Sequence, residues 1–475
     1  MASTSPRTFS AEQLAPVIKA YDVRGVYPDQ FDAQLARAVG AACAEVLGLR
    51  RSDGGTGAMI IGRDMRPSGP ELSDAFARGL MDRGVDVIDI GLCSTDGLYY
   101  ASGSLGHAGA MFTASHNPAE YNGIKLCRPG AVPVGRDTGL AEITELIVAG
   151  APGPSEGIVP GTRSEVDLLA AYGDFLRSLV DLEGIRELSI VVDAGNGMAG
   201  LTAPSVLAPL PLDVSELYYE LDGTFPNHEA NPIDPANLRD LQAAVRASGA
   251  DLGLAFDGDA DRCFAVDERG ELISPSDVTA LIAAAELQRN PGATVIHNLI
   301  TSAAVPEVIR ENGGTPVVTR VGHSFIKARM AETGAVFGGE HSGHFYFRDF
   351  WRADSGMLAA LYLIAALGHT PPGTPVSSLL APYQRYCASG EVNSRVADAG
   401  AATARVRAAF EPTATEVSEL DGLTLGGDGW WFNVRPSNTE PLLRLNVEAR
   451  DEAAMVDLRD RVLAVIRDEA GDATA

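Results

Sequence analysis

The chain has 475 residues, of which 45% are hydrophobic, so it can bury ordinary cores and a largely disordered chain is not expected. At about 150 residues per domain, this length suggests about three domains, with two or four possible. The 37 basic and 63 acidic side chains give a formal net charge of −26, which argues against nucleic acid and anionic membranes as partners. A small anionic substrate needs only a local basic pocket.

Strand-like and helix-like segments alternate along most of the chain. Residues 57–64 (GAMIIGRD) resemble a short buried strand, and 68–84 the helix after it, with Ser68 or Ser73 as cap and Gly84 as terminator. The next strand is expected at 85–91. The same rhythm returns at 188–200, 250–262, 292–302, 303–314 and 315–324. This alternation predicts α/β domains with mixed or parallel sheets.

Three turn-rich or Gly- and Pro-rich segments suggest domain boundaries, at 148–162, 267–277 and 368–378. The C-terminal part lacks a long strand–helix series and ends in an amphipathic helix over 451–470. We therefore favour four domains over three. Their predicted bounds are 1–158, 159–267 and 268–380 for three α/β domains, and 381–475 for a C-terminal α+β domain.

The expected compartment follows from cysteine usage and from the absence of targeting signals. The scattered cysteines form no CxxC pair, which indicates free buried thiols in a reducing compartment. The N-terminal sequence lacks a signal peptide, and no apolar run approaches the roughly 20 residues that span a bilayer. We expect a cytoplasmic protein in which LAALYLIAALG (358–368) is a buried helix.

The strongest metal signal is LAFDGDADR (254–262), in which Asp257, Asp259 and Asp261 alternate with small residues. Three neighbouring carboxylates repel one another in a dry site, and a hard cation such as Mg²⁺ or Ca²⁺ relieves that repulsion. A solvated acidic turn is the alternative. The triplet ends an apolar strand, where ligand sites of α/β proteins gather, and this position favours a cation site.

Two other kinds of site begin with the same spacing. An EF-hand loop needs Gly at its sixth position, which is Arg262 here, although Glu268 falls at its twelfth. An aspartyl-phosphate phosphatase or mutase begins with an apolar strand and DxDx[TV], with Asp257 as nucleophile and Asp259 as acid/base. The fifth position here is Asp261, which weakens this alternative without excluding it.

Two polar loops fit a sugar phosphate. In RPSNTEPLLR (435–444), a guanidinium, a hydroxyl, an amide and turn N–H groups suit a phosphate monoester, although a capped turn between strands is equally compatible. In GGEHSGHFYF (338–347), Glu340 and Ser342 could bond sugar hydroxyls. The glycines there favour a binding loop over a zinc site at His341 and His344.

Basic residues beside glycine turns are candidate anion contacts in so acidic a chain. They are Arg24 in AYDVRG, Arg63 and Arg66 in GRDMRPSG, and Lys125 in NGIKL. Ser115 in TASHNP (113–118) is either a turn serine or a nucleophile. Adjacent Ser and His residues seldom form a catalytic pair, so His116 more readily shapes the loop than activates Ser115.

Taken together, these segments resemble the α-D-phosphohexomutase superfamily, and within it the phosphomannomutase/phosphoglucomutase group. Eight motifs occur in the family's order and span nearly the whole chain: AYDVRG, GRDMRPS, TASHNPAEYNGIK, DAGNGMAG, FDGDADR, VGHSFIK, GEHSGH and RPSNTEP. The resemblance implies a heart-shaped, four-domain protein around a central cleft, with three related α/β domains and a smaller C-terminal α+β domain.

The resemblance also assigns roles to residues. Ser115 matches the family's phosphoserine and, with Asp257, Asp259 and Asp261, its Mg²⁺ ligands. Glu340 and Ser342 match its sugar contacts. The residues that match its phosphate loop are Arg435, Ser437, Asn438 and Thr439, and those that match the reacting end of the cleft are Tyr21, Arg24, Lys125, Arg262, His323 and His344. One departure is His297 with Asn298, where some members carry a phosphate-binding Lys.

The implied activity is that of a phosphomannomutase, which interconverts mannose 6- and 1-phosphates, and also glucose phosphates. The route is a phosphoserine enzyme and a hexose 1,6-bisphosphate, which also serves as activator. His344 and Lys125 are both candidates for the general base. Phosphoglucomutase and phosphoglucosamine mutase are the main alternatives, although GEHSGH favours the mannose/glucose group, and a sugar-phosphate-binding protein is less favoured. The expected partners are small hexose phosphates, with a monomer or dimer.

Overall fold

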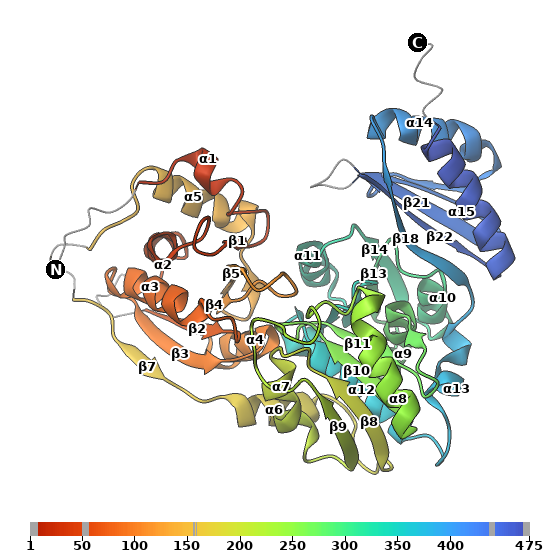
Figure 1. The fold of residues 1–475 in the computed structure, drawn as a ribbon, viewed down its shortest axis with the longest axis horizontal. Helices are drawn as coiled ribbons and strands as arrows, with labels where there is room; N and C mark the ends of the chain where they lie inside the picture. Colours follow the sequence, from red (N-terminus) through yellow and green to blue (C-terminus); the bar gives the residue numbers. More distant parts are fainter. Residues whose placement is uncertain (1–7, 50–56, 155–156, 158, 437–441, 469–475) are drawn as a thin grey trace. The chain divides into compact units, whose positions relative to one another are not determined.

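The computed structural model describes residues 8–49, 57–154, 157, 159–436 and 442–468 (Figure 1). The chain divides into two compact units. The first comprises residues 1–274 and 342–377, and the second comprises residues 275–341 and 378–475.

The first sheet of the first unit is mixed, with strand order β1-β5-β4-β2-β3-β7 and with β6 paired to β5. Four of its strands run parallel: β2 (Ala58–Arg63), β3 (Asp86–Leu92), β4 (Ala108–Phe112) and β7 (Arg163–Glu165). The others pair antiparallel: β1 (Val23–Val26), β5 (Tyr121–Arg128) and β6 (Val132–Pro133).

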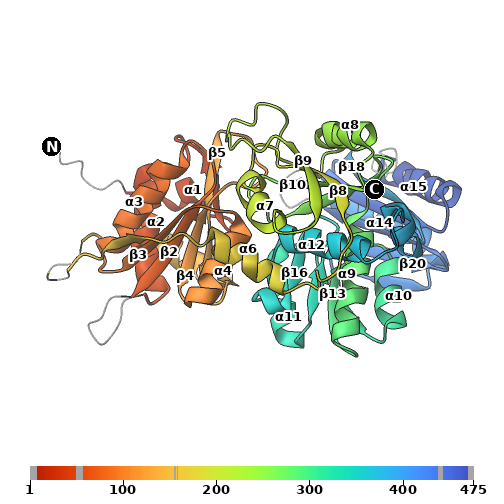
Figure 2. The same ribbon diagram turned by 90° about the horizontal axis from the view of Figure 1, so that it is seen from below.

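Helices cover both faces of this sheet because consecutive strand residues point to opposite sides. Met59 and Ile61 of β2 join the core under α2 (Ala33–Val46) and α3 (Gly69–Met81). Ile60 packs instead with Leu98 of α4 (Thr95–Leu105), which lies on the other face (Figure 2). The short helix α1 (Ala11–Leu14) and α5 (Leu140–Val148) pack on the same face as α2 and α3.

The predicted cap of the helix after residue 64 is wrong in its chemistry. Ser68 holds the N-cap position of α3, but its hydroxyl makes no cap bond and instead accepts from Asn122 Nδ2 at 2.8 Å. Ser73 lies inside the helix and donates to Pro70 O at 3.2 Å. Gly84 follows the helix with a left-handed φ of 74°, as a terminating glycine does.

The second sheet of the first unit repeats the plan, in the order β12-β11-β10-β8-β9. Its parallel strands are β8 (Leu188–Asp193), β9 (Leu212–Leu217) and β10 (Leu252–Phe256), and its antiparallel strands are β11 (Cys263–Val266) and β12 (Leu272–Ile273). Its helices are α6 (Leu169–Ser178), α7 (Ala199–Leu207) and α8 (Arg239–Ser248). Phe256 pairs with Cys263, so residues 257–262 form the turn between β10 and β11.

The first unit also contains β16 (Phe345–Phe347), β17 (Ala353–Asp354) and α12 (Gly356–Gly368), which α13 (Val376–Leu380) follows along the chain. The predicted buried helix at 358–368 is confirmed, because nearly every residue of α12 is buried. No helix in the described ranges has both the length and the apolarity to cross a membrane. The cysteines are all free thiols; Cys43, Cys93, Cys127 and Cys263 are buried and Cys387 is partly buried.

In the second unit, β13 (Thr294–Asn298) pairs in parallel with β14 (Thr315–Thr319) and with β15 (Phe337–Gly339). Its helices are α9 (Pro275–Arg289), α10 (Ala304–Glu311) and α11 (His323–Thr333).

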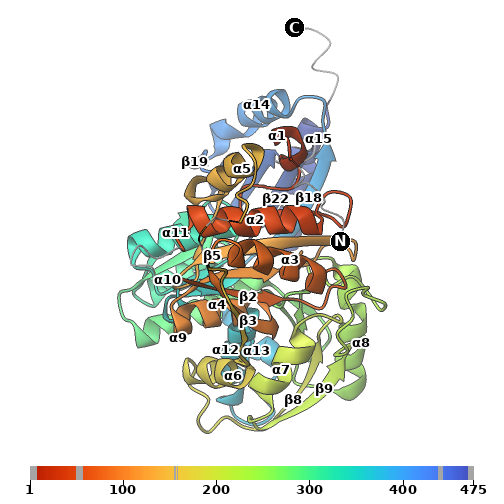
Figure 3. The same ribbon diagram turned by 90° about the vertical axis from the view of Figure 1, so that its left-hand side faces the viewer.

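The C-terminal sheet, also in the second unit, is antiparallel throughout, in the order β18-β22-β21-β20-β19. Its strands are β18 (Cys387–Arg395), β19 (Glu416–Ser418), β20 (Leu423–Gly427), β21 (Trp430–Pro436) and β22 (Leu442–Ala449). Helices α14 (Ala399–Phe410) and α15 (Glu452–Ile466) cover one face, where Phe432 and Val434 join their core (Figures 1 and 3). The predicted fold class, α/β regions with mixed pairing followed by a C-terminal α+β region, is confirmed.

Candidate active site

Two strand ends of the first unit carry the candidate reacting groups. Ser115 follows β4, and Asp257 follows β10. The chain leaves β2 for β3 on one side and returns to β4 on the other, so the carboxyl ends of β2 and β4 flank a switch point. Ligands of open α/β sheets bind at such points.

The Ser115 side chain meets three polar groups. Its hydroxyl donates to Asp257 Oδ2 at 2.7 Å, and Oγ lies 3.2 Å from His116 Nδ1 and 3.3 Å from Arg262 Nη2. Ser115 is only 5% exposed and has a left-handed φ of 50°. A non-glycine residue holds this conformation only where its surroundings impose it.

Arg66 holds the Ser115 loop in place. Its guanidinium donates to the carbonyl oxygens of Ser115, Asn117, Pro118 and Tyr121 at 2.9, 2.7, 2.7 and 2.8 Å. Its Nε donates to Asp64 Oδ2 at 3.2 Å, and the side chain is fully buried. The expectation that Arg66 contacts an anion is therefore wrong, because the loop already occupies its donors.

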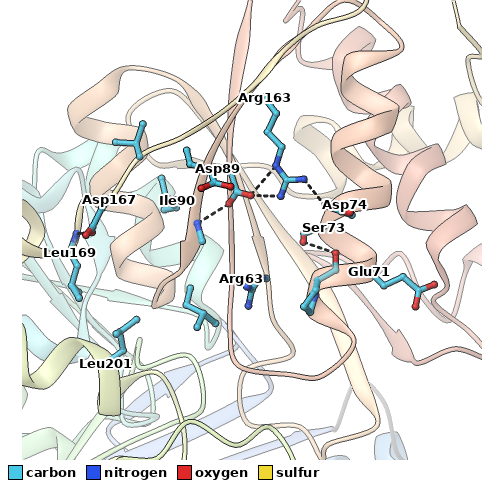
Figure 4. A pocket seen from close by; sticks show the side chains of 15 residues that line it. Arg63, Glu71, Ser73, Asp74, Asp89, Ile90, Arg163, Asp167, Leu169 and Leu201 are labelled. Carbon is cyan, nitrogen blue, oxygen red and sulfur yellow. Dashed lines mark hydrogen bonds and ion pairs between the residues drawn. The ribbon is translucent and has the colours of Figure 1, made fainter.

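Arg63 and Arg24 have separate surroundings. Arg63 lines a cavity of about 790 Å³ whose wall also holds Arg163, in ion pairs with Asp74 and Asp89 (Figure 4). Arg24 donates to Asn117 Oδ1 at 2.7 Å, so it contacts the Ser115 loop. Tyr21, three residues before Arg24, is 36% exposed.

The three Asp carboxylates form one buried cluster. Ligand oxygens of Asp257, Asp259 and Asp261 lie within 4.8 Å of one another, and all three residues are at most 1% exposed. Lys125 Nζ on β5 donates to Asp259 Oδ2 and to Asp261 Oδ2, both at 2.6 Å. Among the described residues, Asp259 Oδ1 and Asp261 Oδ1 are buried without a hydrogen-bond partner. Orphaned buried carboxylate oxygens fit a hard divalent cation.

The electrostatics of the cluster differ from one carboxylate to the next. Burial raises the pKa of Asp257 to about 7, and Arg262 opposes this only in part. Burial also acts to raise the pKa of Asp259, but the Lys125 ammonium outweighs it and holds that pKa well below its usual range. Burial and the charge of Arg262 lower the pKa of His116 to about 2, so this ring is neutral and accepts hydrogen bonds.

His344 lies beside the Asp cluster. Its Nε2 is 3.6 Å from Asp261 Oδ1 and 3.9 Å from Asp354 Oδ2, and its Nδ1 is 3.1 Å from Ser342 Oγ. The backbones of His344 and Arg262 form an antiparallel bridge. The structure thus brings His344 and Ser342 together with the predicted reacting residues of the first unit.

The remaining predicted contacts belong to the second unit. Glu340 Oε1 accepts from Gly322 N at 3.1 Å and from Asn298 Nδ2 at 3.3 Å. Arg435 donates to Glu391 Oε2 at 2.6 Å. His341 Nδ1 lies 3.3 Å from Ser276 Oγ rather than with His344. The His323 side chain and Ser437, Asn438 and Thr439 lie outside what the structure describes.

The motif DAGNGMAG packs against the Asp loop. Met198 N donates to Gly258 O at 2.9 Å, and a Cβ on Gly197 would lie 2.8 Å from that same oxygen. Sequence reasoning missed this contact, the carbonyl clamp of Arg66 and the bond from Thr95 to Asp259. The motifs signalled the first two by position, whereas nothing in the sequence signalled Thr95.

Comparisons with known proteins agree over most of the chain. Family models for phosphoglucomutase/phosphomannomutase match at residues 16–151 (alpha/beta/alpha domain I), 170–270 (domain II), 275–386 (domain III) and 391–465 (C-terminal domain). Phosphohexose mutases of Xanthomonas campestris are 41% identical over 450 residues, which cover 94% of this chain and 98% of the relative. A phosphomannomutase of Salmonella typhimurium is 40% identical over 456 residues, with the same coverage. A solved Burkholderia thailandensis phosphoglucomutase/phosphomannomutase family protein has a TM-score of 0.85 and 34% identity, covering 97% of this chain and 99% of its own.

Proposed function

Because the chain belongs to the phosphoglucomutase/phosphomannomutase family and is a phosphohexose mutase, an isomerase, we propose that it interconverts mannose 6-phosphate and mannose 1-phosphate through Ser115. Glucose phosphates are proposed as further substrates. The observation that carries this proposal is the position of Ser115 Oγ, 2.7 Å from Asp257 and 3.3 Å from Arg262.

The proposed reaction has two transfers. Phosphorylated Ser115 gives its phosphoryl group to the free hydroxyl of a hexose monophosphate: the Ser115 O–P bond breaks, a sugar O–P bond forms, the sugar hydroxyl loses its proton, and the Ser115 oxygen gains one. The resulting hexose 1,6-bisphosphate turns round while bound. In the second transfer the other sugar O–P bond breaks, the Ser115 O–P bond forms again, and the proton passes from Ser115 to the sugar oxygen, so the free hydroxyl has moved from one end of the sugar to the other.

The surroundings of Ser115 suit phosphoryl transfer, which depends on positioning and charge stabilisation more than on covalent help. Arg66 holds the backbone of the loop that carries the reacting oxygen. Arg262 and Lys125 place positive charge beside that oxygen and beside the triplet. Arg24 contacts the same loop through Asn117. These cations can stabilise the negative charge spread over a transferring phosphoryl group.

The Asp triplet fits a Mg²⁺ site. Asp257, Asp259 and Asp261, together with an oxygen of phosphorylated Ser115, would hold the ion. When bound, Mg²⁺ polarises the phosphoryl oxygens and offsets their charge.

We assign the general base to His344 in preference to Lys125. Burial acts to lower the pKa of Lys125, but Asp259 and Asp261 outweigh it and raise that pKa well above its ordinary value, so the ammonium stays charged. An imidazole can serve both as general base and as general acid. His344 lies beside Asp261 and within reach of Ser342 Oγ.

The substrate's sugar and its non-reacting phosphate are assigned to the two polar loops. Glu340 and Ser342 would bond the sugar hydroxyls, and Arg435 with Ser437, Asn438 and Thr439 would hold the phosphate. Tyr21 and His323 are proposed as further substrate contacts. A loop that recognises the phosphate group rather than the sugar atom that carries it can accept either end of the substrate. The bisphosphate needs this when it turns round.

The sugar preference is tested by kcat/KM for mannose 1-, glucose 1- and glucosamine 1-phosphate, each assay started with a trace of the hexose 1,6-bisphosphate. We expect mannose and glucose substrates within about tenfold of each other, because they differ only at C2 and one hydroxyl contact contributes about 1 kcal/mol. A strong preference for glucosamine 1-phosphate would reassign the protein to the phosphoglucosamine group.

A further inference from the structure

The first turn of α4 lies directly against the Asp triplet, although no motif marks it. Thr95 is completely buried. Its N–H donates to the Asp259 carbonyl oxygen at 3.0 Å, and its hydroxyl donates to Asp259 Oδ2 at 2.6 Å. One residue therefore fixes both the backbone and the side chain of Asp259.

These bonds make the two carboxylate oxygens of Asp259 different. Oδ2 accepts from Thr95 Oγ1 and from Lys125 Nζ, each at 2.6 Å. Oδ1 is buried and has no hydrogen-bond partner among the described residues. The structure thus leaves one defined oxygen of Asp259 available for a cation.

Thr95 and Lys125 both donate to Asp259 Oδ2, but they affect a bound cation differently. The ammonium bridges Asp259 and Asp261 on a flexible stem, and its charge opposes any cation that approaches them. The Thr95 hydroxyl is neutral, so it orients the carboxylate without repelling a cation. It is also rigid, because it stands on the first turn of an 11-residue helix.

Asp96, the next residue, anchors that turn. Its Oδ2 accepts from Tyr172 OH at 2.8 Å and from Ser355 Oγ at 2.6 Å, and its Oδ1 accepts from Ser94 Oγ. Ser355 is itself the N-cap of α12 and accepts from Leu358 N at 3.0 Å. The starts of α4 and α12 are therefore joined through one buried carboxylate.

The start of α12 also packs on the Asp loop. A Cβ added to Gly356 would lie 2.6 Å from the Arg262 carbonyl carbon and 3.1 Å from Ala260 O. Two helix starts, tied together by Asp96, thus support the loop that carries Asp257, Asp259 and Asp261.

We propose that Thr95 is a positioning residue that sets the affinity of the Asp triplet for its divalent cation, by holding Asp259 with Oδ1 turned to the ion. This inference rests on the Mg²⁺ site of the proposed function. Thr95 touches neither the cation nor the substrate in this account; it acts through Asp259. Outer partners of metal ligands typically change metal affinity 10- to 100-fold when removed.

The test is calorimetric titration of Mg²⁺ into the full-length protein and its variants. Thr95→Val keeps the shape and removes the hydroxyl, and we expect its Mg²⁺ Kd to rise about tenfold or more. Thr95→Ser keeps the hydroxyl and should bind within about twofold of the wild type. Ser102→Ala removes a buried hydroxyl at the far end of the same helix, where it bonds His107 O, and should also match the wild type.

Each outcome decides a separate point. Thr95→Val binding Mg²⁺ as tightly as the wild type, or more tightly, overturns the inference, as does equal weakening in Thr95→Ser. If Thr95→Val does not fold, Thr95→Ala is read in its place by the same criterion. A wild-type protein that binds no Mg²⁺ contradicts the metal site of the proposed function itself, which is a different result.

Discussion

Two functional arginines, one in each unit, are held in different ways. Arg66 in the first unit is fully buried and donates to four carbonyl oxygens of the Ser115 loop. In the second unit, Arg435 pairs with Glu391, whose side chain is 30% exposed. Rigid placement suits a site where one oxygen must attack in line, whereas a site that accepts either end of a sugar needs charge more than fixed geometry. Variants of Arg66 and Arg435 should therefore fail differently.

The largest expected effect is at the reacting oxygen. Ser115→Ala should lower kcat by about 10⁴-fold or more, because no other hydroxyl replaces the phosphate carrier. Binding of glucose 1-phosphate, followed by calorimetry, should change by less than about threefold, because the variant removes one oxygen. Substantial turnover by pure Ser115→Ala would show that Ser115 is not the phosphate carrier.

Arg66→Lys should disturb the backbone of the Ser115 loop. An ammonium has three donors where the guanidinium has five, so buried carbonyl oxygens of the Ser115 loop would lose their bonds. We expect the free energy of unfolding to fall by about 3 kcal/mol and kcat by about 100-fold.

The matched control is Arg83→Lys, since Arg83 is a partly buried arginine that donates to Glu45 and to Gly153 O. Urea unfolding and kcat measure both variants. If Arg66→Lys resembles Arg83→Lys in kcat, the loop does not depend on the clamp.

Asp96, which joins the starts of α4 and α12, should make the stability of the protein depend on pH. Burial raises its pKa to about 6, although three hydroxyl donors oppose that rise. The folded state therefore binds the proton more tightly than the unfolded state. This contribution to stability is full below about pH 4 and is lost as pH rises through about 6, up to about 3 kcal/mol.

Asp96→Asn removes this titration and keeps a polar group for the hydroxyls. Its free energy of unfolding relative to wild type should therefore rise between pH 4 and pH 6, measured by urea unfolding at each pH. A difference that stays flat across this range would place the Asp96 titration elsewhere.

The smallest expected effect lies in the second unit. Arg435→Ala should raise KM for mannose 1-phosphate by about 30-fold, or about 2 kcal/mol, because a charge-assisted contact to phosphate is lost. Its kcat should fall less than about fivefold, in contrast to Arg66→Lys. Steady-state kinetics over a range of substrate concentrations separate KM from kcat, and a kcat loss in Arg435→Ala equal to that in Arg66→Lys would rule out this difference between the two arginines.

The sequence predicted the features that depend on residues close together in the chain. Alternating apolar strands and capped helices predicted the α/β regions, and the carboxylates after LGLAF predicted the Asp cluster. It failed where partners are remote or carry no side-chain signal. Arg66 was predicted to contact an anion, but it bonds backbone carbonyl oxygens instead. Every residue has such an oxygen, so the sequence does not show which ones Arg66 will bond. Thr95 lies 164 residues from Asp259, and only the fold brings them together.

The central claim, that Ser115 carries the transferred phosphate, is tested most directly by a labelled chase. Enzyme labelled with ³²P from glucose 1,6-bisphosphate is digested, and the labelled peptide is identified, before and after addition of mannose 1-phosphate. We expect label on the peptide that contains Ser115, stable to hydroxylamine and passed to the sugar at least as fast as kcat. Hydroxylamine-labile label on Asp257, retained in Ser115→Ala, would contradict it.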